Sequence, residues 1–135
     1  MLTADDHLAI HRLIALYGHL TDERQFSRLD EVFTSDAAYD LAYRDGPVYY
    51  GYSGVRELFE ELIEQHALAH HTGTVVIDER DDDTADVLSK GILVHDDGTV
   101  HSTTYRQVAV RTAKGWRLSY LAPELRSRDM IPPVS

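Results

Sequence analysis

Asp22 and His71 are the residues of this sequence whose types best suit proton transfer. An imidazole can accept a proton near neutral pH, and a carboxylate beside it can fix which ring nitrogen carries the hydrogen. Asp22 stands just past an amphipathic helical stretch, and His71 begins an apolar, strand-like stretch. Taken alone, such an aspartate is more often a cap of the following turn, and such a histidine is more often a satisfied polar residue. The pair is a candidate for acid-base chemistry if the fold brings the two side chains together.

Aromatic and basic side chains supply the other candidates for a site. Tyr17 falls on the apolar stripe of the first predicted helix, where core packing and hydrogen-bond donation at a cavity edge are both open to it. Arg126 can clamp a carboxylate or carbonyl with paired hydrogen bonds, although a surface salt bridge is the commoner use. We expect Tyr105, Leu121 and Arg126 to contact a substrate. Other tyrosines can line a pocket or pack in the core, namely Tyr43, Tyr49 and Tyr50.

Metal and nucleotide sites are not predicted. His7 and His11 are one helical turn apart, and His95 and His101 flank an Asp-Gly turn, but neither pair has an evident third ligand. The acidic run at 81–83 lacks the glycine and the closing glutamate of a calcium loop. The sequence contains no glycine-rich loop of the kind that cradles phosphates. We therefore expect chemistry without a cofactor.

Amino-acid composition and charge limit the kinds of site and partner that this chain can have. The 135 residues carry a formal net charge of -10 and contain no cysteine, which excludes disulfides, thiolate nucleophiles and cysteine-ligated metals. Lysine and arginine never gather into a stripe, so the negative charge of the chain disfavours nucleic acid and anionic membrane surfaces as partners. The first residues do not resemble a signal peptide, and no apolar run reaches membrane-spanning length. We expect a cytoplasmic protein with one domain over residues 1–135.

Hydrophobic periodicity predicts an α+β fold. Apolar residues at helical spacing indicate a helix from Thr3 to about Thr21, a shorter one over 26–33, and a third from Ser53 to about Ala67. A first strand is expected over 37–43. Four longer strands joined by short acidic or glycine-containing turns follow, at 70–80, 84–95, 99–112 and 116–125. Helices first and a long antiparallel meander afterwards are typical of helices packed on one face of a sheet.

Three segments resemble a known family. They are Tyr17-x4-Asp22 before RQFSRLDEVF, the strand start His70-His71-Thr72-Gly73, and the ending GWRLSYLAPELR. Together with the order of elements, they are similar to the SnoaL-like family of the nuclear transport factor 2-like superfamily, nearest to its scytalone dehydratase and bile-acid dehydratase group. The resemblance implies a cone-shaped α+β barrel, in which three N-terminal helices pack on a curved, mainly antiparallel sheet and enclose a pocket.

The same resemblance implies roles for residues. Asp22 and His71 match a catalytic carboxylate and imidazole, and Tyr17 matches an active-site tyrosine. The chain departs from scytalone dehydratase at Thr21 and Leu41, where that enzyme has tyrosines, and at Tyr105, where it has an asparagine. An acid that related polyketide cyclases carry on the last strand is missing from 119–121, which makes cyclase activity less favoured.

We therefore expect a cofactor-independent lyase or isomerase, dehydratase-like, that acts by His/Asp acid-base chemistry. Its substrate would be a small hydrophobic molecule with a hydroxyl or carbonyl group, such as a polyketide, phenolic or steroid-like compound. The alternative is a non-catalytic module that binds a small molecule or forms oligomers with the same fold. Apolar residues on the second sheet face predict a homo-oligomer, either a dimer or a trimer.

Overall fold

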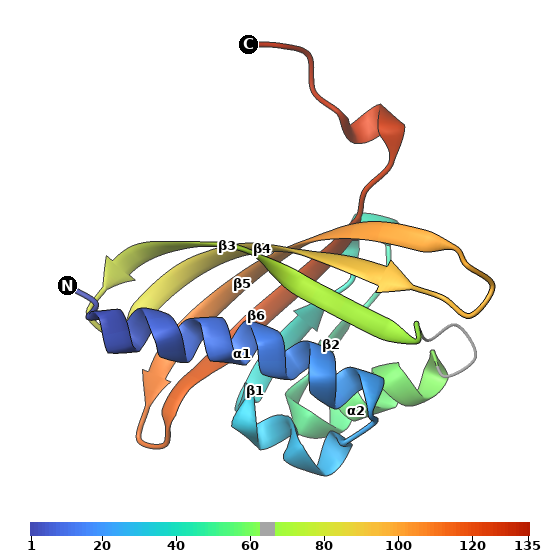
Figure 1. The fold of residues 1–135 in the computed structure, drawn as a ribbon. Coiled ribbons are helices and arrows are strands. Elements are labelled where there is room, and N and C mark those ends of the chain that lie inside the picture. Colours follow the sequence, from blue (N-terminus) through green and yellow to red (C-terminus); the bar gives the residue numbers. More distant parts are fainter. Residues whose placement is uncertain (63–66) are drawn as a thin grey trace.

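Long alternating stretches in the second half of the chain form most of one curved, six-stranded sheet in the computed structural model (Figure 1). The structure describes residues 1–62 and 67–135. The strands lie in the order β2-β1-β6-β5-β4-β3, and all neighbours are antiparallel except β1 and β6, which are parallel. Their bounds are β1 Phe33–Asp40, β2 Val48–Tyr50, β3 Ala69–Asp81, β4 Thr84–Val94, β5 Val100–Thr112 and β6 Gly115–Leu125.

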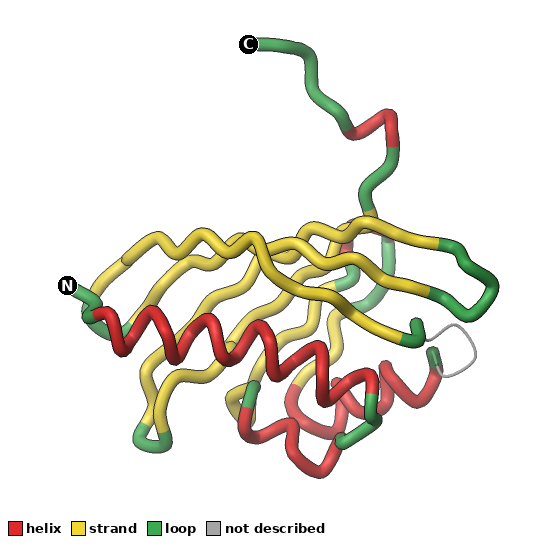
Figure 2. The backbone as a smooth tube through the Cα atoms, viewed as in Figure 1, coloured by secondary structure: helices red, strands yellow, loops and turns green. Residues whose placement is uncertain are grey.

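The helices lie on the concave side of this sheet, as Figure 2 shows. Helix α1 (Ala4–Asp22) packs against β3 and β6, and helix α2 (Gly51–Glu61) packs against β1 and β2. The described residues also form three short 3-10 helices: η1 (Phe26–Glu31), η2 (Ala42–Arg44) and η4 (Arg128–Met130). The cone-shaped α+β architecture expected from the sequence is confirmed. Beyond β6, the C-terminal segment leads away from the sheet (Figure 1).

Three boundaries differ from the sequence prediction. The second helix is a 3-10 turn that stops at Glu31, and the first strand begins at Phe33 and ends at Asp40. The pair Val32–Phe33 is buried, and apolar spacing does not show whether such a pair ends a helix or starts a strand. Helix α2 begins at Gly51 without a side-chain cap. The predicted end of this helix, including Ile63, falls partly at 63–66, outside the described residues.

Alternation along the strands builds the core between sheet and helices. Side chains such as Ala85, Val87, Ala109 and Leu118 are almost completely buried on the concave face, because successive strand residues point to opposite faces. One polar pair lies among them: Gln107 Nε2 donates to Ser89 Oγ at 2.9 Å. This bond satisfies two groups that would otherwise be costly to bury.

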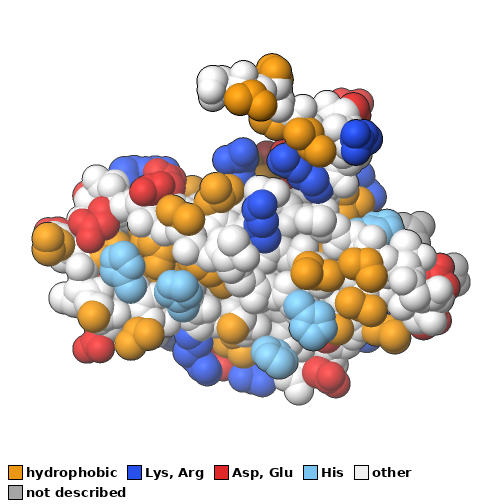
Figure 3. All heavy atoms as spheres, turned by 45° about the horizontal axis from the view of Figure 1, so that its top comes forward, with side chains coloured by type: hydrophobic (Ala, Val, Ile, Leu, Met, Phe, Trp, Pro, Cys, Tyr) orange, Lys and Arg blue, Asp and Glu red, His pale blue; other side chains and the backbone are white. Residues whose placement is uncertain are grey.

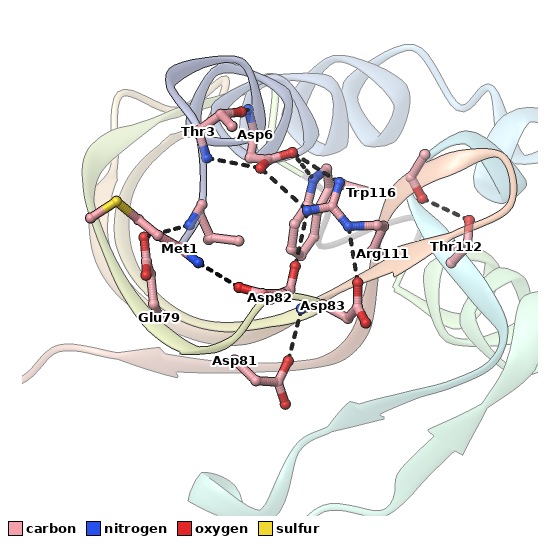
Figure 4. Close-up of polar contacts among 12 residues, drawn as sticks. Met1, Thr3, Asp6, Glu79, Asp81, Asp82, Asp83, Arg111, Thr112 and Trp116 are labelled. Carbon is pink, nitrogen blue, oxygen red and sulfur yellow. Dashed lines mark hydrogen bonds and ion pairs between the residues drawn. The ribbon is translucent and has the colours of Figure 1, made fainter.

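At the N-terminal end of α1, a polar network ties the helix to the sheet (Figure 4). Thr3 and Asp6 form a capping box, with Asp6 N–H donating to Thr3 Oγ1 at 3.1 Å. The Asp6 carboxylate also accepts two bonds from the Arg111 guanidinium, at 3.0 and 3.2 Å, and one from the Trp116 indole at 3.0 Å. The terminal amine of Met1 contacts Asp82 in the β3–β4 turn. The start of α1 is therefore fixed to β5, β6 and this turn.

The opposite end of the cone brings five strands together. The register aligns the start of β3 with the end of β4, the start of β5 and the end of β6, and β1 ends on the same side. Helix α1 also ends there, so that its last residue, Asp22, lies beside the start of β3. This wide end is where the fold can hold a ligand.

Candidate functional site

A cavity of about 260 Å³ opens at the wide end of the cone. Most of its wall is apolar or aromatic, and the polar groups on the wall are tyrosine hydroxyls, imidazoles, one threonine and one arginine. Among the residues with these polar groups are Tyr17, Tyr39, Arg44, His70, His95, His101, Thr103 and Tyr105. A small number of polar groups in an apolar hollow is the usual composition of a small-molecule site.

The carboxylate of Asp22 meets an imidazole at this cavity, but the imidazole is that of His70. Asp22 Oδ1 lies 2.5 Å from His70 Nδ1, and the His70 backbone N–H donates to the same carboxylate at 3.0 and 3.1 Å. The side chains of His70 and Asp22 are only 7% and 14% exposed. Asp22 therefore binds both the ring and the backbone of one residue, which fixes the orientation of the imidazole.

His71 is not part of this pair, which corrects the expectation from the sequence. His71 is exposed and is not among the residues that line the cavity. The physical reason is a β-bulge between Gly73 and Val76, where β3 carries one extra residue relative to β4 and Thr74 adopts a positive φ of 53°. Counting back by twos from the inward-facing Ile77 would point His71 inward, whereas the bulge shifts the alternation to His70.

Gly18 lets α1 approach β3 closely enough for this contact. A Cβ at Gly18 would lie 3.0 Å from the carbonyl oxygen of His70, closer than side chains normally come to backbone. Nearby, Thr72 Oγ1 donates to the Ile14 carbonyl at 3.1 Å. The close approach of α1 to β3 at Gly18 therefore allows Asp22 to reach His70.

Next to the pair lies a cluster of buried tyrosines. The hydroxyls of Tyr17 and Tyr39 are 2.6 Å apart, and the ring of Tyr17 contacts those of His70 and Tyr105 edge-on, at centroid distances of 6.4 and 5.8 Å. Burial, reinforced by the neighbouring tyrosines, raises the pKa of Tyr17 well above its usual range. Burial likewise raises the pKa values of Tyr39 and Tyr105. These hydroxyls stay protonated at neutral pH and can donate hydrogen bonds.

The residues expected to contact substrate divide into two groups. Tyr105 lines the cavity, and its ring fits over β4 because Gly91 has no side chain: a Cβ there would lie 2.7 Å from the ring. Leu121 is completely buried and does not line the cavity. Arg126 is exposed beyond β6, with its backbone N–H bonded to Ser102. Neither Leu121 nor Arg126 enters the mechanism proposed for this site.

Several residues of the site were not predicted from the sequence. Tyr39 comes from β1, and Arg44 comes from η2, which the sequence pattern placed within a strand and its turn. His95 and His101 were considered only as metal ligands. Their ring centroids lie 5.0 Å apart on the cavity wall. Within residues 1–62 and 67–135, no three histidine or acidic side chains are grouped so that they could hold a metal ion.

A family model described as SnoaL-like domain matches residues 3–122. The chain belongs to the SnoaL-like family. Comparison with curated proteins gives no match. No helix in the described part of this SnoaL-like chain is long and apolar enough to span a membrane.

Solved structures share the fold of this SnoaL-like protein. One is a protein of unknown function with a cystatin-like fold from Nostoc punctiforme, with 21% identity, a TM-score of 0.82 and coverage of 94% of this chain and 96% of that chain. Another is a putative aromatic ring hydroxylase from Novosphingobium aromaticivorans, with 27% identity, a TM-score of 0.74 and coverage of 98% and 94%. A third is the hexachlorocyclohexane dehydrochlorinase LinA-type3 from Novosphingobium barchaimii, with 18% identity, a TM-score of 0.77 and coverage of 98% and 99%.

Proposed function

We propose that this SnoaL-like protein is a cofactor-independent lyase or isomerase in which His70 and Asp22 transfer a proton. The observation that carries the proposal is the 2.5 Å contact between Asp22 Oδ1 and His70 Nδ1 at the wall of an apolar cavity. A carboxylate on Nδ1 favours the tautomer with hydrogen on that nitrogen, so that Nε2 carries the lone pair of the ring. This is the arrangement of an oriented general base.

The reaction we propose begins at a carbon beside a carbonyl group. His70 Nε2 removes the proton, and the negative charge that develops on the carbonyl oxygen is stabilised by the hydroxyl of Tyr17, which is itself bonded to Tyr39. In a dehydration, the C–O bond at the β carbon then breaks as the C=C bond forms. The imidazolium returns its proton to the leaving hydroxide, which departs as water. In an isomerisation, the same proton returns to another carbon.

The surroundings favour charge separation within the cavity. Leu41, Leu58 and Phe59 line it together with the tyrosines, and electrostatic contacts are stronger where water is scarce. A positioned general base contributes about 100- to 10,000-fold to a rate. A volume of about 260 Å³ suits a substrate of one or two rings. The likeness to a dehydrochlorinase supports the proposal only in that the fold can host an elimination catalyst.

Exchange of hydrogen for deuterium beside the carbonyl of α-tetralone tests the base directly. The ketone is a small bicyclic molecule, and proton NMR in D2O follows the loss of its C2 signal without requiring the natural substrate. We expect the wild-type protein to accelerate the exchange and His70→Ala to lose at least about a hundredfold of that acceleration. His71→Ala is the matched control, because His71 is exposed outside the cavity.

Dehydration of 4-hydroxy-4-phenyl-2-butanone, followed by the absorbance of the conjugated product, tests the complete elimination. A folded His70→Ala variant with wild-type rates in both assays would refute the proposed base. Binding of the ketones without any acceleration by the wild-type protein would favour the non-catalytic binding module instead.

A further inference from the structure

We infer that the substrate of this cavity carries a carboxylate, and that His95, His101 and Arg44 hold it at the rim. The inference rests on the proposed function in taking the cavity as the substrate site. It adds the chemical class of the substrate and gives a role to a histidine pair that the proton-transfer mechanism does not use.

The histidine pair faces the cavity from the β4–β5 hairpin. His95 follows the last residue of β4 and His101 lies near the start of β5, with ring centroids 5.0 Å apart. Both rings line the cavity. Two imidazoles at this separation can donate N–H groups to the two oxygens of one carboxylate.

Thr103 supplies an independent sign that a polar ligand group binds here. This residue is 2% exposed and lines the cavity, two positions along β5 from His101 and therefore on the same face. Its hydroxyl lies close enough to Tyr105 to lower the pKa of that tyrosine. Within the described residues, however, Thr103 Oγ1 has no hydrogen-bond partner of good geometry. A buried hydroxyl without a partner is uncommon, and a ligand oxygen would satisfy it.

The charges around the cavity favour an anion. The described lining contains Arg44 and three histidines but no aspartate or glutamate, although the whole chain has 23 acidic residues. The Arg44 charge reaches the tyrosine cluster, since it acts to lower the pKa of Tyr39 against the larger effect of burial. In the turn between the two histidines, Asp97 accepts a 2.8 Å bond from the Thr99 backbone N–H and is not among the residues that line the cavity. The rim can therefore attract a negative group.

The strand register sets how far this group lies from the reacting carbon. His101 pairs with Leu93, and Leu93 pairs with His70, so that His101 and His70 lie in one row of the sheet and two strand spacings apart. Two spacings correspond to about 10 Å. A carboxylate held by His101 and a carbon beside His70 can then be bridged by roughly one six-membered ring. This geometry points to an aromatic or alicyclic carboxylic acid.

Isothermal titration of 3-phenylpropionate and 3-phenylpropionamide tests the inference, because the two probes share shape and differ in charge. We expect the wild-type protein to bind the acid at least about tenfold more tightly than the amide. The double variant His95→Gln/His101→Gln should lose this preference, mainly through weaker binding of the acid. Arg44→Gln should reduce the preference and Arg44→Lys should partly restore it. His71→Gln, on the outer face, should leave it intact.

Equal binding of the two probes by the wild-type protein would overturn the inference, as would binding of neither at millimolar concentration. Retention of the full preference in the double variant would also overturn it. None of these results depends on catalysis. An acid preference without exchange of α-tetralone would refute the proposed base and keep the carboxylate site, whereas exchange that requires His70 without an acid preference would do the reverse.

Discussion

Two single residues, Tyr17 and Tyr39, place a protonated hydroxyl beside the Asp22–His70 pair. Because burial raises the pKa of both phenols, neither ionises at neutral pH, and the 2.6 Å contact between them orients one hydroxyl through the other. In the proposed mechanism Tyr39 donates its hydrogen to the Tyr17 oxygen, which leaves the Tyr17 O–H to donate to the developing oxyanion, and Tyr39 is a positioning residue that acts through Tyr17.

Tyr17→Phe removes that donor and leaves the ring in place. We expect the exchange rate of α-tetralone to fall by about 10- to 1,000-fold, in the range found when one oxyanion donor is lost. The retained ring should keep the affinity for 3-phenylpropionamide within about threefold, since the apolar wall is unchanged. Proton NMR of α-tetralone exchange and isothermal titration of 3-phenylpropionamide measure these two effects. Unaltered exchange by a folded Tyr17→Phe would remove Tyr17 from the mechanism.

Of the residues predicted for the site, Tyr17 and Tyr105 line the cavity, and Asp22 contacts the lining residue His70. The sequence pattern predicted His71 as the partner of Asp22, whereas the structure places His70 there. Adjacent strand residues differ only in the face they occupy, and one bulge at 73–76 reverses that choice. The bulge could not be predicted from Thr74, because a positive φ is expected at glycine and not at threonine. Whether His95 and His101 face the cavity depends on the register of the β4–β5 hairpin, and amino-acid composition does not specify that register.

The packing of helix α1 on strand β3 affects both the stability of the fold and the position of Asp22 in the site. Gly18→Ala places a methyl group 3.0 Å from the His70 carbonyl oxygen. Overpacking costs about 1 to 3 kcal/mol, which exceeds the gain of roughly 1 kcal/mol from replacing glycine inside a helix. We therefore expect urea unfolding to show a net loss of stability, together with slower α-tetralone exchange as Asp22 moves away from His70. Gly73→Ala is the control, since a Cβ there meets nothing within 4 Å. A Gly18→Ala variant as stable and as active as wild type would contradict the packing argument.

The Asp6 network predicts how this end of the fold responds to acid. Bonds from Arg111, from the Thr3 backbone and from Trp116 hold the pKa of Asp6 well below its usual range. A carboxyl with a lower pKa in the folded state stabilises the fold above its unfolded pKa of about 3.9, and this contribution is lost as the pH falls toward the folded value. Asp6→Asn should therefore lower the melting temperature at pH 7 and reduce its further fall below about pH 4. Thermal melts across acid pH measure both effects, and parallel curves for the two proteins would show that Asp6 contributes nothing by this route.

The four long strands could be predicted within about one residue because turns and alternation mark both ends of each. For β3, for example, the expectation of 70–80 compares with Ala69–Asp81. The three-residue strand β2 was missed, since Val48–Tyr50 is too short to show alternation. The parallel pairing of β1 with β6 was also missed. It joins segments distant in sequence, and no local pattern encodes it.

The outer face of the sheet is the surface on which we expect a second copy of the chain to pack. Val76, Ile92 and Val100 are 51%, 50% and 60% exposed, and Figure 3 shows hydrophobic side chains lying between charged and histidine side chains over this side of the molecule. Apolar groups exposed together favour association with a second copy. The homo-oligomer, dimer or trimer, expected from the sequence remains a prediction.

Light scattering coupled to size-exclusion chromatography measures the mass of the particle in solution and so tests this prediction. We expect a mass of two or three chains for the wild-type protein at micromolar concentration. Ile92→Lys should shift the mass toward one chain, because a charge at the centre of the apolar strand face must be desolvated on association. Lys90→Arg, a neighbouring change that keeps the charge, is the control. A wild-type protein that elutes as a monomer would refute the prediction.

The proposed proton transfer requires that Asp22 hold the His70 ring with its hydrogen on Nδ1 and its lone pair on Nε2. Long-range proton–nitrogen NMR of ¹⁵N-labelled protein distinguishes the two neutral tautomers, and His70→Gln assigns the signal by its disappearance. We predict an Nδ1-protonated ring for His70 in the wild type, and loss of that preference in Asp22→Asn. A wild-type His70 ring protonated on Nε2 alone, unchanged by Asp22→Asn, would contradict the claim and with it the proposed base.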